Sequence, residues 1–299
     1  MAKSLDRLTL LETFVRISER GSISAAARDL NLSQASASRQ LSDLESRLGV
    51  QLIVRTTHSL SLTKAGMDCL TRARAQLRGW ESLTESFADE AHAMRGPLRI
   101  VAPIAVGQRH LADAVLAFQR RYPEVTVDWI LQDGDIRFAE TGCDLWIKVG
   151  PVPDETLVVR SVRSVERLIV AAPDFLGSEA SLDSPADLKD KSCAGLLPFE
   201  NGRIPLTHES GRAYILEARP VFSTSNIFAA RQATRLGNGF AVMPKWLVRD
   251  DLASGALLDL LPDWRAPELD INMAYAPVNR QTLRLKRLVE TMVAALQEL

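Results

Sequence analysis

The segment between Gly21 and Gly49 restricts the possible fold of this chain more than any other stretch of similar length. It reads GSISAAARDLNLSQASASRQLSDLESRLG, with alanines and serines surrounding Arg39. A core helix needs bulky apolar residues, and a solvated helix carries many charges. A helical surface of alanine and serine around one arginine therefore predicts a helix that comes very close to another molecule.

Residues that start and stop helices divide this region into predicted elements. Apolar side chains recur at helical spacing over about residues 5–18, which predicts a first amphipathic helix. Gly21 ends that helix, and Ser22 or Ser24 can cap a second helix over residues 25–30.

A third helix follows, with Ser33 at its N-cap and Gly49 as its stop. On a helical wheel, one face is apolar and is expected to be buried: Ala37, Leu41, Leu44 and Leu48. The opposite face is small and polar, with Gln34 at its N-terminal end: Ala35, Ser38, Arg39, Ser42 and Ser46.

This face has the composition expected of a helix lying in the major groove of DNA. The groove is about 12 Å wide, so residues against its walls must be small, while Gln and Arg can form paired hydrogen bonds with base edges. We therefore expect Gln34 and Arg39 to contact bases. The alternative is an alanine- and serine-rich helix packed within a small helical bundle.

The next stretch, VQLIVRTTHSLSLTKAG, alternates apolar and polar residues and predicts a short hairpin, or wing. Basic and hydroxyl side chains near its tip are suited to phosphate oxygens. The complete set of expected DNA contacts is Ser33, Gln34, Ala35, Ser38, Arg39, Ser42, Arg55, Thr57 and His58.

No proline interrupts residues 63–94, which predicts one long helix. Its apolar residues alternate at spacings of three and four, as in a coiled coil, with Thr84 as the one polar break. A narrow stripe is best buried against a second copy, so we expect a dimer seam at Leu70, Leu77, Trp80 and Phe87. The alternative is packing on the chain's own C-terminal domain.

The charge distribution supports a division into a DNA-binding end and a separate body. The chain has 299 residues, enough for two domains, and a net charge of −1. Its first 80 residues contain 12 Lys and Arg against 7 Asp and Glu, an excess of +5, so the remainder carries −6. A basic head on an acidic body is typical of a DNA-binding sensor.

Strand and helix patterns alternate after Gly96-Pro97. Strands over 98–102, 125–131 and 144–150, with a helix over 110–123, predict a parallel sheet covered by helices on both faces. The pattern restarts near residue 166 and returns to the first half near residue 270. Two α/β halves joined by two crossovers form a hinged cleft, and ligands bind such clefts at the carboxyl ends of strands.

This topology predicts the residues that line the cleft. In the first half they are Pro103, Ile104, Ala105, Gln132, Asp133 and Lys148. In the second half they are Phe199, Thr224, Ser225 and Asn226. Free amides at the start of a helix favour an anion, so we expect a small, partly apolar organic acid held mainly by the second half.

A series of motifs at fixed spacing extends over residues 5–66: Leu11–Phe14, Gly21-Ser22, Ala25–Ala27, Leu32-Ser33-Gln34, Ser38-Arg39-Gln40-Leu41, Leu44-Glu45, Leu48-Gly49, Arg55-Thr56 and Leu62-Thr63-Lys64-Ala65-Gly66. Together they resemble the winged helix-turn-helix of LysR-type transcriptional regulators. The chain departs from the family pattern at Ala35, where a proline is usual, and at Ala37, where a valine is usual. A further departure is Ala105, since many relatives keep Ser or Thr there to hold an effector carboxylate.

The resemblance implies an α/β protein with three parts. They are a winged helix-turn-helix over 1–63, a linker and dimerisation helix over 64–95 and a periplasmic-binding-protein-like effector domain over 96–299. The segments APIAVGQRHL and GCDLWIKVGPVPDETL are similar to one subgroup of the family. Two Rossmann-like α/β subdomains are expected in the effector domain, one from 96–162 with 267–299 and the other from 163–266.

The function implied is sequence-specific regulation of transcription, tuned by a small-molecule effector. We expect a cytoplasmic homodimer that binds an inverted repeat in double-stranded DNA, and a homotetramer formed through the effector domains. RNA polymerase is a further candidate partner. The chain contains no GxSxG, HExxH or phosphate-binding glycine loop, so we expect no catalytic residue, metal or cofactor.

Two other functional classes remain open. One is a solute-binding or enzyme-like α/β protein with a nonspecific DNA tether. The other is a redox-sensing regulator that uses Cys143 and Cys193. No apolar run approaches the roughly 18 residues of a membrane span, and the N-terminus lacks a signal-peptide pattern, so no membrane partner is expected.

Overall fold

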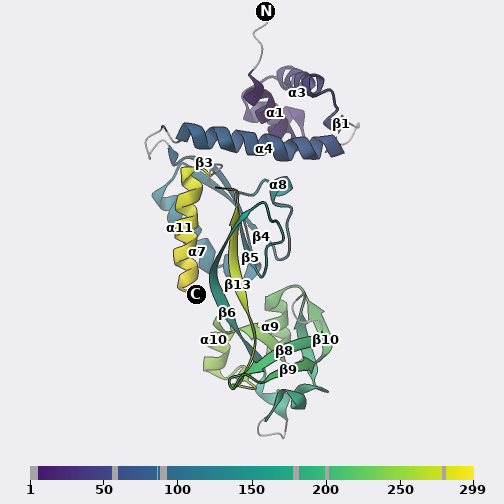
Figure 1. Ribbon diagram of the computed structural model, residues 1–299, viewed down its shortest axis with the longest axis vertical. Coiled ribbons are helices and arrows are strands. Elements are labelled where there is room, and N and C mark those ends of the chain that lie inside the picture. Colours follow the sequence, from purple (N-terminus) through teal and green to yellow (C-terminus); the bar gives the residue numbers. More distant parts are fainter. Residues whose placement is uncertain are drawn as a thin grey trace, which may run out of the picture.

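The computed structural model describes residues 6–55, 60–85, 87, 93–177, 182–198, 202–277 and 281–299. Figure 1 shows a helical head at one end, the long helix α4 crossing beneath it, and two lobes built around strands on the other side of α4. Within the described ranges, no helix is long and apolar enough to cross a lipid bilayer.

The head contains the three predicted helices. They are α1 (Arg7–Arg20), α2 (Ile23–Asp29) and α3 (Gln34–Leu48). The side chain of Ser22 caps α2 and that of Ser33 caps α3, while Gly21 and Gly49 end α1 and α3 in the left-handed conformation. The predicted capping residues and stops are confirmed.

The wing consists of β1 (Ile53–Arg55) and β2 (Leu60–Leu62), which pair antiparallel. Glu45 of α3 holds its base, because its Oε1 accepts hydrogen bonds from the backbone amides of Leu52 (2.8 Å) and Ile53 (3.2 Å). A side chain of α3 therefore sets the orientation of the wing relative to that helix.

Helix α4 (Lys64–Glu85) begins where the sequence predicts. The prediction of one long helix over 63–94 is wrong at Phe87, which lies in a turn after the end of α4 at Glu85, and residues 86 and 88–92 are outside the described ranges. The predicted dimer seam is wrong at Leu70, which is 6% exposed and belongs to the core of the head. Leu77 packs on the same core, whereas Trp80 (51% exposed) and Phe87 (86%) face outward.

The first lobe of the effector domain contains a sheet of β3 (Gly96–Ala102), β4 (Val125–Leu131) and β5 (Leu145–Val149), in which β3 lies between β4 and β5 and is parallel to both. Its helices are α6 (Ile104–Gly107), α7 (His110–Arg121), α8 (Phe138–Thr141) and, from the C-terminus, α11 (Leu283–Gln297). One core joins these strands to α7 and α11. The predicted return of the C-terminus to the first half is confirmed.

Two long strands cross between the lobes: β6 (Val158–Ala171) and β13 (Trp264–Tyr275). They pair antiparallel with each other, and β13 also pairs antiparallel with β5. The expectation of a parallel sheet is therefore wrong at β13, because the chain returns from the second lobe through this strand and β13 runs opposite to both of its neighbours, β5 and β6. Figure 1 shows the two strands running side by side from one lobe to the other.

The second lobe packs its helices and strands around the far ends of β6 and β13. Its strands are β7 (Ser192–Leu196), β8 (Arg203–His208), β9 (Ala213–Glu217), β10 (Arg219–Thr224), β11 (Ala241–Pro244) and β12 (Leu258–Asp259). Its helices are the short 3-10 turns Pro173–Leu176 and Pro185–Leu188, with α9 (Ile227–Arg235) and α10 (Lys245–Ser254). The alternation of strand and helix places the start of α9 at the end of β10, facing the first lobe.

Candidate DNA-reading helix and effector cavity

Helix α3 is fixed in the head by one buried face. Ala37 and Leu41 are fully buried and Leu44 is 5% exposed, as the wheel predicts. Leu48 is 49% exposed, so its assignment to the buried stripe is wrong. It is the last residue of the helix, one position before the terminating Gly49. Gln40 lies on the buried face instead, where it pairs with Thr13.

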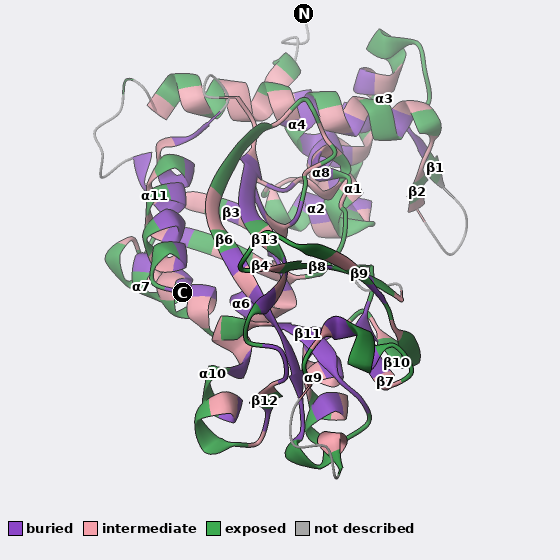
Figure 2. Cartoon of the chain, turned by 60° about the horizontal axis from the view of Figure 1, so that its bottom comes forward, coloured by how far each residue is buried: buried purple, intermediate pink, exposed green. Residues whose placement is uncertain are grey.

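The outward face of α3 carries the predicted DNA contacts. Gln34, Ala35, Arg39 and Ser42 are exposed, and Ser38 is half-buried. Figure 2 shows this outer side of the helix as part of the exposed surface of the head. Two hydroxyls already have local partners: Ser33 accepts from the Ser36 amide (3.1 Å), and Ser42 donates to the Ser38 carbonyl (3.1 Å). Gln34 and Arg39 are the long polar side chains exposed on this face.

The tip of the wing lies outside the described residues, and with it the predicted contacts Thr57 and His58. Arg55 is the last residue of β1, opposite Leu60, and its side chain is not among those described. Their roles in phosphate binding stay predictions.

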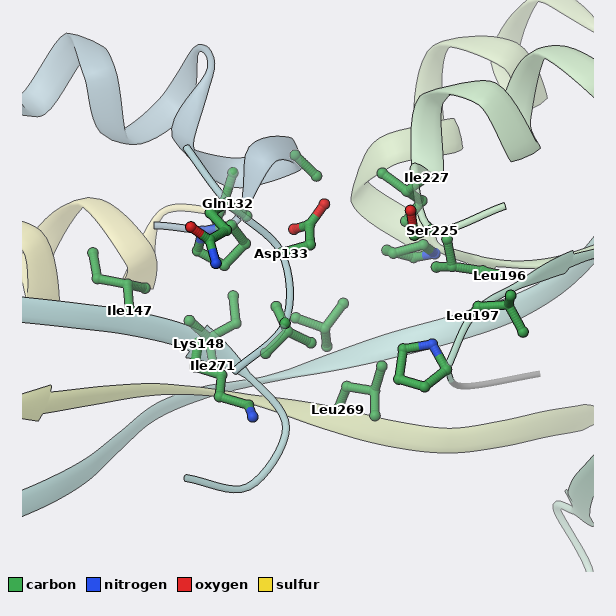
Figure 3. Close-up of a pocket in the computed structure, with 18 of the residues that line it drawn as sticks. Gln132, Asp133, Ile147, Lys148, Leu196, Leu197, Ser225, Ile227, Leu269 and Ile271 are labelled. Atoms are coloured by element: carbon green, nitrogen blue, oxygen red, sulfur yellow. The ribbon is translucent and has the colours of Figure 1, made fainter. Parts of the chain in front are cut away.

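A cavity of about 440 Å³ lies between the two lobes. Figure 3 shows side chains of both lobes converging on it above the crossing strands β6 and β13. Six of the predicted cleft residues line it: Pro103, Ala105, Gln132, Asp133, Lys148 and Ser225. The carboxyl ends of β3 and β4 and the start of α9 therefore meet at one site, as expected for this topology.

Three predicted cleft residues do not line the cavity, and a fourth is not described. Ile104, Thr224 and Asn226 are absent from its wall, and Phe199 lies outside the described residues. The Asn226 side chain caps α9 by accepting from the amides of Phe228 (3.0 Å) and Ala229 (3.2 Å). The Thr224 hydroxyl accepts from the Asn226 amide at 3.1 Å.

The expectation of unpaired amides at the start of α9 is therefore wrong for Phe228 and Ala229, because the Asn226 side chain accepts from both. A helix beginning with an asparagine cap has fewer donors to offer a bound anion. Ser225 is left as the residue of this segment that faces the cavity, and Figure 3 shows it across the opening from Asp133.

Charged side chains of the first lobe line the cavity. Lys148 of β5 pairs with Asp135, and burial lowers the pKa of its ammonium group. Asp133 accepts from the Ile104 amide at 3.1 Å, and burial raises the pKa of its carboxyl group. For both Lys148 and Asp133, desolvation disfavours the charged form, while the bond to Asp135 or to the Ile104 amide stabilises it.

The sequence analysis missed Arg167, which lies on β6 and lines the cavity. It is 7% exposed, and its Nε donates to the Pro267 carbonyl at 2.7 Å. Only a weak signal was present in the sequence, since Arg167 directly precedes the apolar run LIVAA of a predicted strand. It also missed the apolar wall, which includes Trp146, Leu196, Leu197, Pro198, Trp246, Leu269 and Ile271.

The cysteines are poorly suited to redox sensing. Cys143 is fully buried, its thiol donates to the Leu145 carbonyl at 2.9 Å, and burial raises the pKa of this thiol to about 12. Cys193 is 1% exposed. A reactive sensor thiol is exposed and has a lowered pKa, so the chemistry of Cys143 disfavours that alternative. In the part of the chain that the structure describes, no group of three or more His, Cys, Asp or Glu side chains could hold a metal ion.

Two family models match this chain. The bacterial regulatory helix-turn-helix protein of the lysR family matches residues 8–67, and the LysR substrate binding domain matches residues 91–297. The HTH-type transcriptional regulator PtxR of Pseudomonas aeruginosa is 28% identical over 297 residues, covering 98% of this chain and 95% of PtxR.

Solved structures are similar over the whole length. The full-length Vibrio cholerae virulence activator AphB is 26% identical, with a TM-score of 0.60 over 97% of this chain and 99% of AphB. CrgA, a LysR-type transcriptional regulator from Neisseria meningitidis, is 25% identical, with a TM-score of 0.58 over 97% of this chain and 98% of CrgA.

Proposed function

Because this chain belongs to the LysR family of DNA-binding transcriptional regulators, which are controlled by small-molecule effectors, we propose that it reads promoter DNA through the outward face of α3 and is controlled by a small, partly apolar organic acid. The acid occupies the cavity between the two lobes. This assignment leaves no role for a cofactor or a catalytic residue.

The observation that carries the DNA-binding role is the outward face of α3. Ala35 and Ser42 are small and exposed, so the helix can approach the walls of a major groove. Gln34 and Arg39 are exposed on the same face and are residue types that bond base edges in pairs. Arg55, Thr57 and His58 of the wing supply phosphate contacts in this proposal, because basic and hydroxyl groups fix a protein on the DNA backbone.

The effector class follows from the balance of apolar wall and charged groups in the cavity. Most lining residues are apolar, which favours an aromatic or short aliphatic body. Lys148 and Arg167 come from β5 and β6 and provide positive charge for a carboxylate. A bound carboxylate competes with Asp135 for Lys148, while Ser225 and Gln132 supply neutral hydrogen bonds.

The assembly we propose is a homodimer through α4, with a homotetramer formed by further contacts between effector domains. Trp80 and Phe87 are large and exposed on the outward side of this segment, and a second copy would cover them. Such a dimer presents two α3 helices to the half-sites of an inverted repeat. RNA polymerase remains a candidate partner, and a DNA target in the bacterial chromosome supports a cytoplasmic location.

The DNA-binding role is tested by gel shift with the region upstream of the chain's own gene. Specific binding survives an excess of random-sequence duplex of equal length and is removed by an excess of the unlabelled upstream duplex. Equal competition by both duplexes would favour the nonspecific DNA tether instead. The named relatives are transcriptional regulators, which agrees with the first outcome.

A further inference from the structure

The C-terminal end of α8 is held by three arginines from other elements. Arg74 of α4 donates to the carbonyls of Ala139 (3.3 Å) and Glu140 (2.5 Å). Arg99 of β3 donates to the Thr141 carbonyl at 3.1 Å, and Arg78 of α4 to the Cys143 carbonyl at 3.5 Å. Cations at the C-terminal end of a helix oppose its exposed carbonyl dipoles, so this end of α8 is a strong docking point for α4.

Arg74 differs from the other two because it also reaches the DNA-binding head. Its Nη2 lies 3.2 Å from Oε1 of Glu19 on α1, while its Nη1 bonds α8. One guanidinium thus joins α1, α4 and α8, and it is only 8% exposed. Figures 1 and 2 both show α8 beside α4, and in Figure 1 α4 lies between α8 and the head.

The chain around Arg74 is shaped to fit its guanidinium. Gly142, which ends α8, has a φ of +69°, and a Cβ there would lie 2.7 Å from Cζ of Arg74. Any other residue at this position would strain the backbone and displace the arginine. The guanidinium is planar and buried, and its hydrogen-bond acceptors are fixed. A shift of one acceptor therefore moves the guanidinium and changes its bonds to the other acceptors.

The C-terminal end of α4 is anchored separately to the effector domain. Arg284 of α11 forms ion pairs with Glu85 (2.5 Å) and Glu81 (2.9 Å), and Ser82 donates to the Gln281 carbonyl at 3.0 Å. With this end fixed, a movement of α8 changes how the middle of α4, at Arg74, and the attached head are held.

The loop that precedes α8 forms part of the cavity wall. It runs from the end of β4 to Phe138 and places Asp133, Gly134 and Asp135 on the cavity, where Asp135 pairs with Lys148. A ligand carboxylate that binds Lys148 releases Asp135, and this loop leads within three residues to α8. The cavity and Arg74 are therefore connected by one short, continuous segment.

We infer that Arg74 is the positioning residue that couples the occupancy of the cavity to the placement of the DNA-binding head, through the loop 132–137, α8 and Glu19. This inference rests on the proposed function, since it assigns a route of regulation between the two sites already described. Because coupling between two sites is reciprocal, DNA binding at the head must alter the loop and α8.

The test is hydrogen exchange of the full-length chain, with and without a duplex of the region upstream of its own gene. In the unsubstituted chain the duplex slows exchange in α3 and changes exchange over residues 132–141 by about fivefold or more. In Arg74→Gln the protection of α3 persists, and the change over 132–141 falls below about twofold. Arg72→Gln, an exposed arginine on the same helix, is the matched control and behaves like the unsubstituted chain.

The inference is overturned if the duplex changes hydrogen exchange over residues 132–141 equally in the unsubstituted chain and in Arg74→Gln. It is also overturned if the duplex protects α3 of the unsubstituted chain but leaves exchange over 132–141 unchanged. Failure of the duplex to protect α3 instead contradicts the proposed function. In that case a second experiment tests the coupling without DNA. Glu19→Gln should change hydrogen exchange over residues 132–141 about fivefold in a chain that keeps Arg74, and it should have no effect in the Arg74→Gln chain. An effect of Glu19→Gln that is equal in both backgrounds, or absent in both, overturns it.

Should Arg74→Gln prove unfolded, Gly142→Ala displaces the guanidinium without removing it and should abolish the same exchange change. Gly211→Ala is its control, because Gly211 has an equally left-handed φ of +85° and nothing within 4 Å of the added Cβ. Equal behaviour of the two alanine variants would count against Arg74.

Discussion

The hydroxyl of Thr13 on α1 donates a hydrogen bond to the side-chain carbonyl of Gln40 on α3, 2.5 Å away. Thr13 is 1% and Gln40 is 5% exposed, so neither can exchange this partner for water. The bond lies on the buried face of α3, whereas Arg39 lies on the exposed face. It therefore fixes the rotation of the helix that we propose enters the groove.

Replacing Thr13 by valine should lower the free energy of unfolding of the head by about 1–3 kcal/mol, because the buried Gln40 carbonyl loses its donor. Urea denaturation followed by circular dichroism measures this loss. The double variant Thr13→Val, Gln40→Leu should lose less than the sum of the two single variants, since no unpaired polar group remains. Strict additivity would show that the bond does not stabilise the head.

Arg39→Ala should weaken binding to a specific site by about 1–3 kcal/mol and leave binding to random duplex much less affected, because a base contact discriminates between sequences. Arg55→Ala should instead weaken both duplexes alike and reduce the dependence of log K on log salt, as expected for a phosphate contact. Fluorescence anisotropy at several salt concentrations measures both effects. Equal losses on the two duplexes for Arg39→Ala would remove this residue from base reading.

Substitution of Trp80 and Phe87 by serine should weaken the dimer while the chain stays folded, because both side chains are exposed in one copy. Leu70→Ala should instead destabilise the head by about 2–5 kcal/mol, because Leu70 is buried there. Analytical ultracentrifugation and thermal unfolding separate the two effects. Unchanged dimerisation of the serine variant would place the interface elsewhere.

Ser225→Ala should weaken effector binding roughly two- to tenfold, the effect of one neutral hydrogen bond. Thr224→Ala should leave the affinity unchanged, because the Thr224 hydroxyl bonds Asn226 and does not line the cavity. The probe is whichever of benzoate and the short-chain carboxylates raises the melting temperature most, and calorimetric titration gives its affinity. An effect of Thr224→Ala as large as that of Ser225→Ala would contradict this arrangement of the wall.

Cys143 should resist alkylation by iodoacetamide at pH 8 in the folded chain. With the pKa of its thiol raised to about 12, roughly one molecule in ten thousand carries the reactive thiolate at that pH, and the group is also buried. Mass spectrometry of labelled peptides should find Cys69, which is partly exposed, modified first. Rapid labelling of Cys143 would reopen the redox-sensing alternative.

Local sequence features determined the helical head. Ser22, Ser33 and Gly49 act on amides and carbonyls within one helical turn of themselves, so their effects are visible in a short stretch of sequence. The alternation of strands and helices likewise predicted that the ends of β3, β4 and β5 face a common site. Asp133 and Lys148 could be assigned to the cavity for that reason.

Tertiary structure decided which groups those local elements meet. Leu70 has the same coiled-coil spacing as Trp80, but it packs into the head and Trp80 does not. Arg167 enters the cavity because β6 crosses between the lobes antiparallel to β13. Arg74 meets Glu140, 66 positions along the chain, and Glu19, 55 positions before it. Periodicity shows which face of an element is apolar, but a hydrogen bond or a buried contact across such separations depends on how the whole chain packs, and no short-range pattern records it.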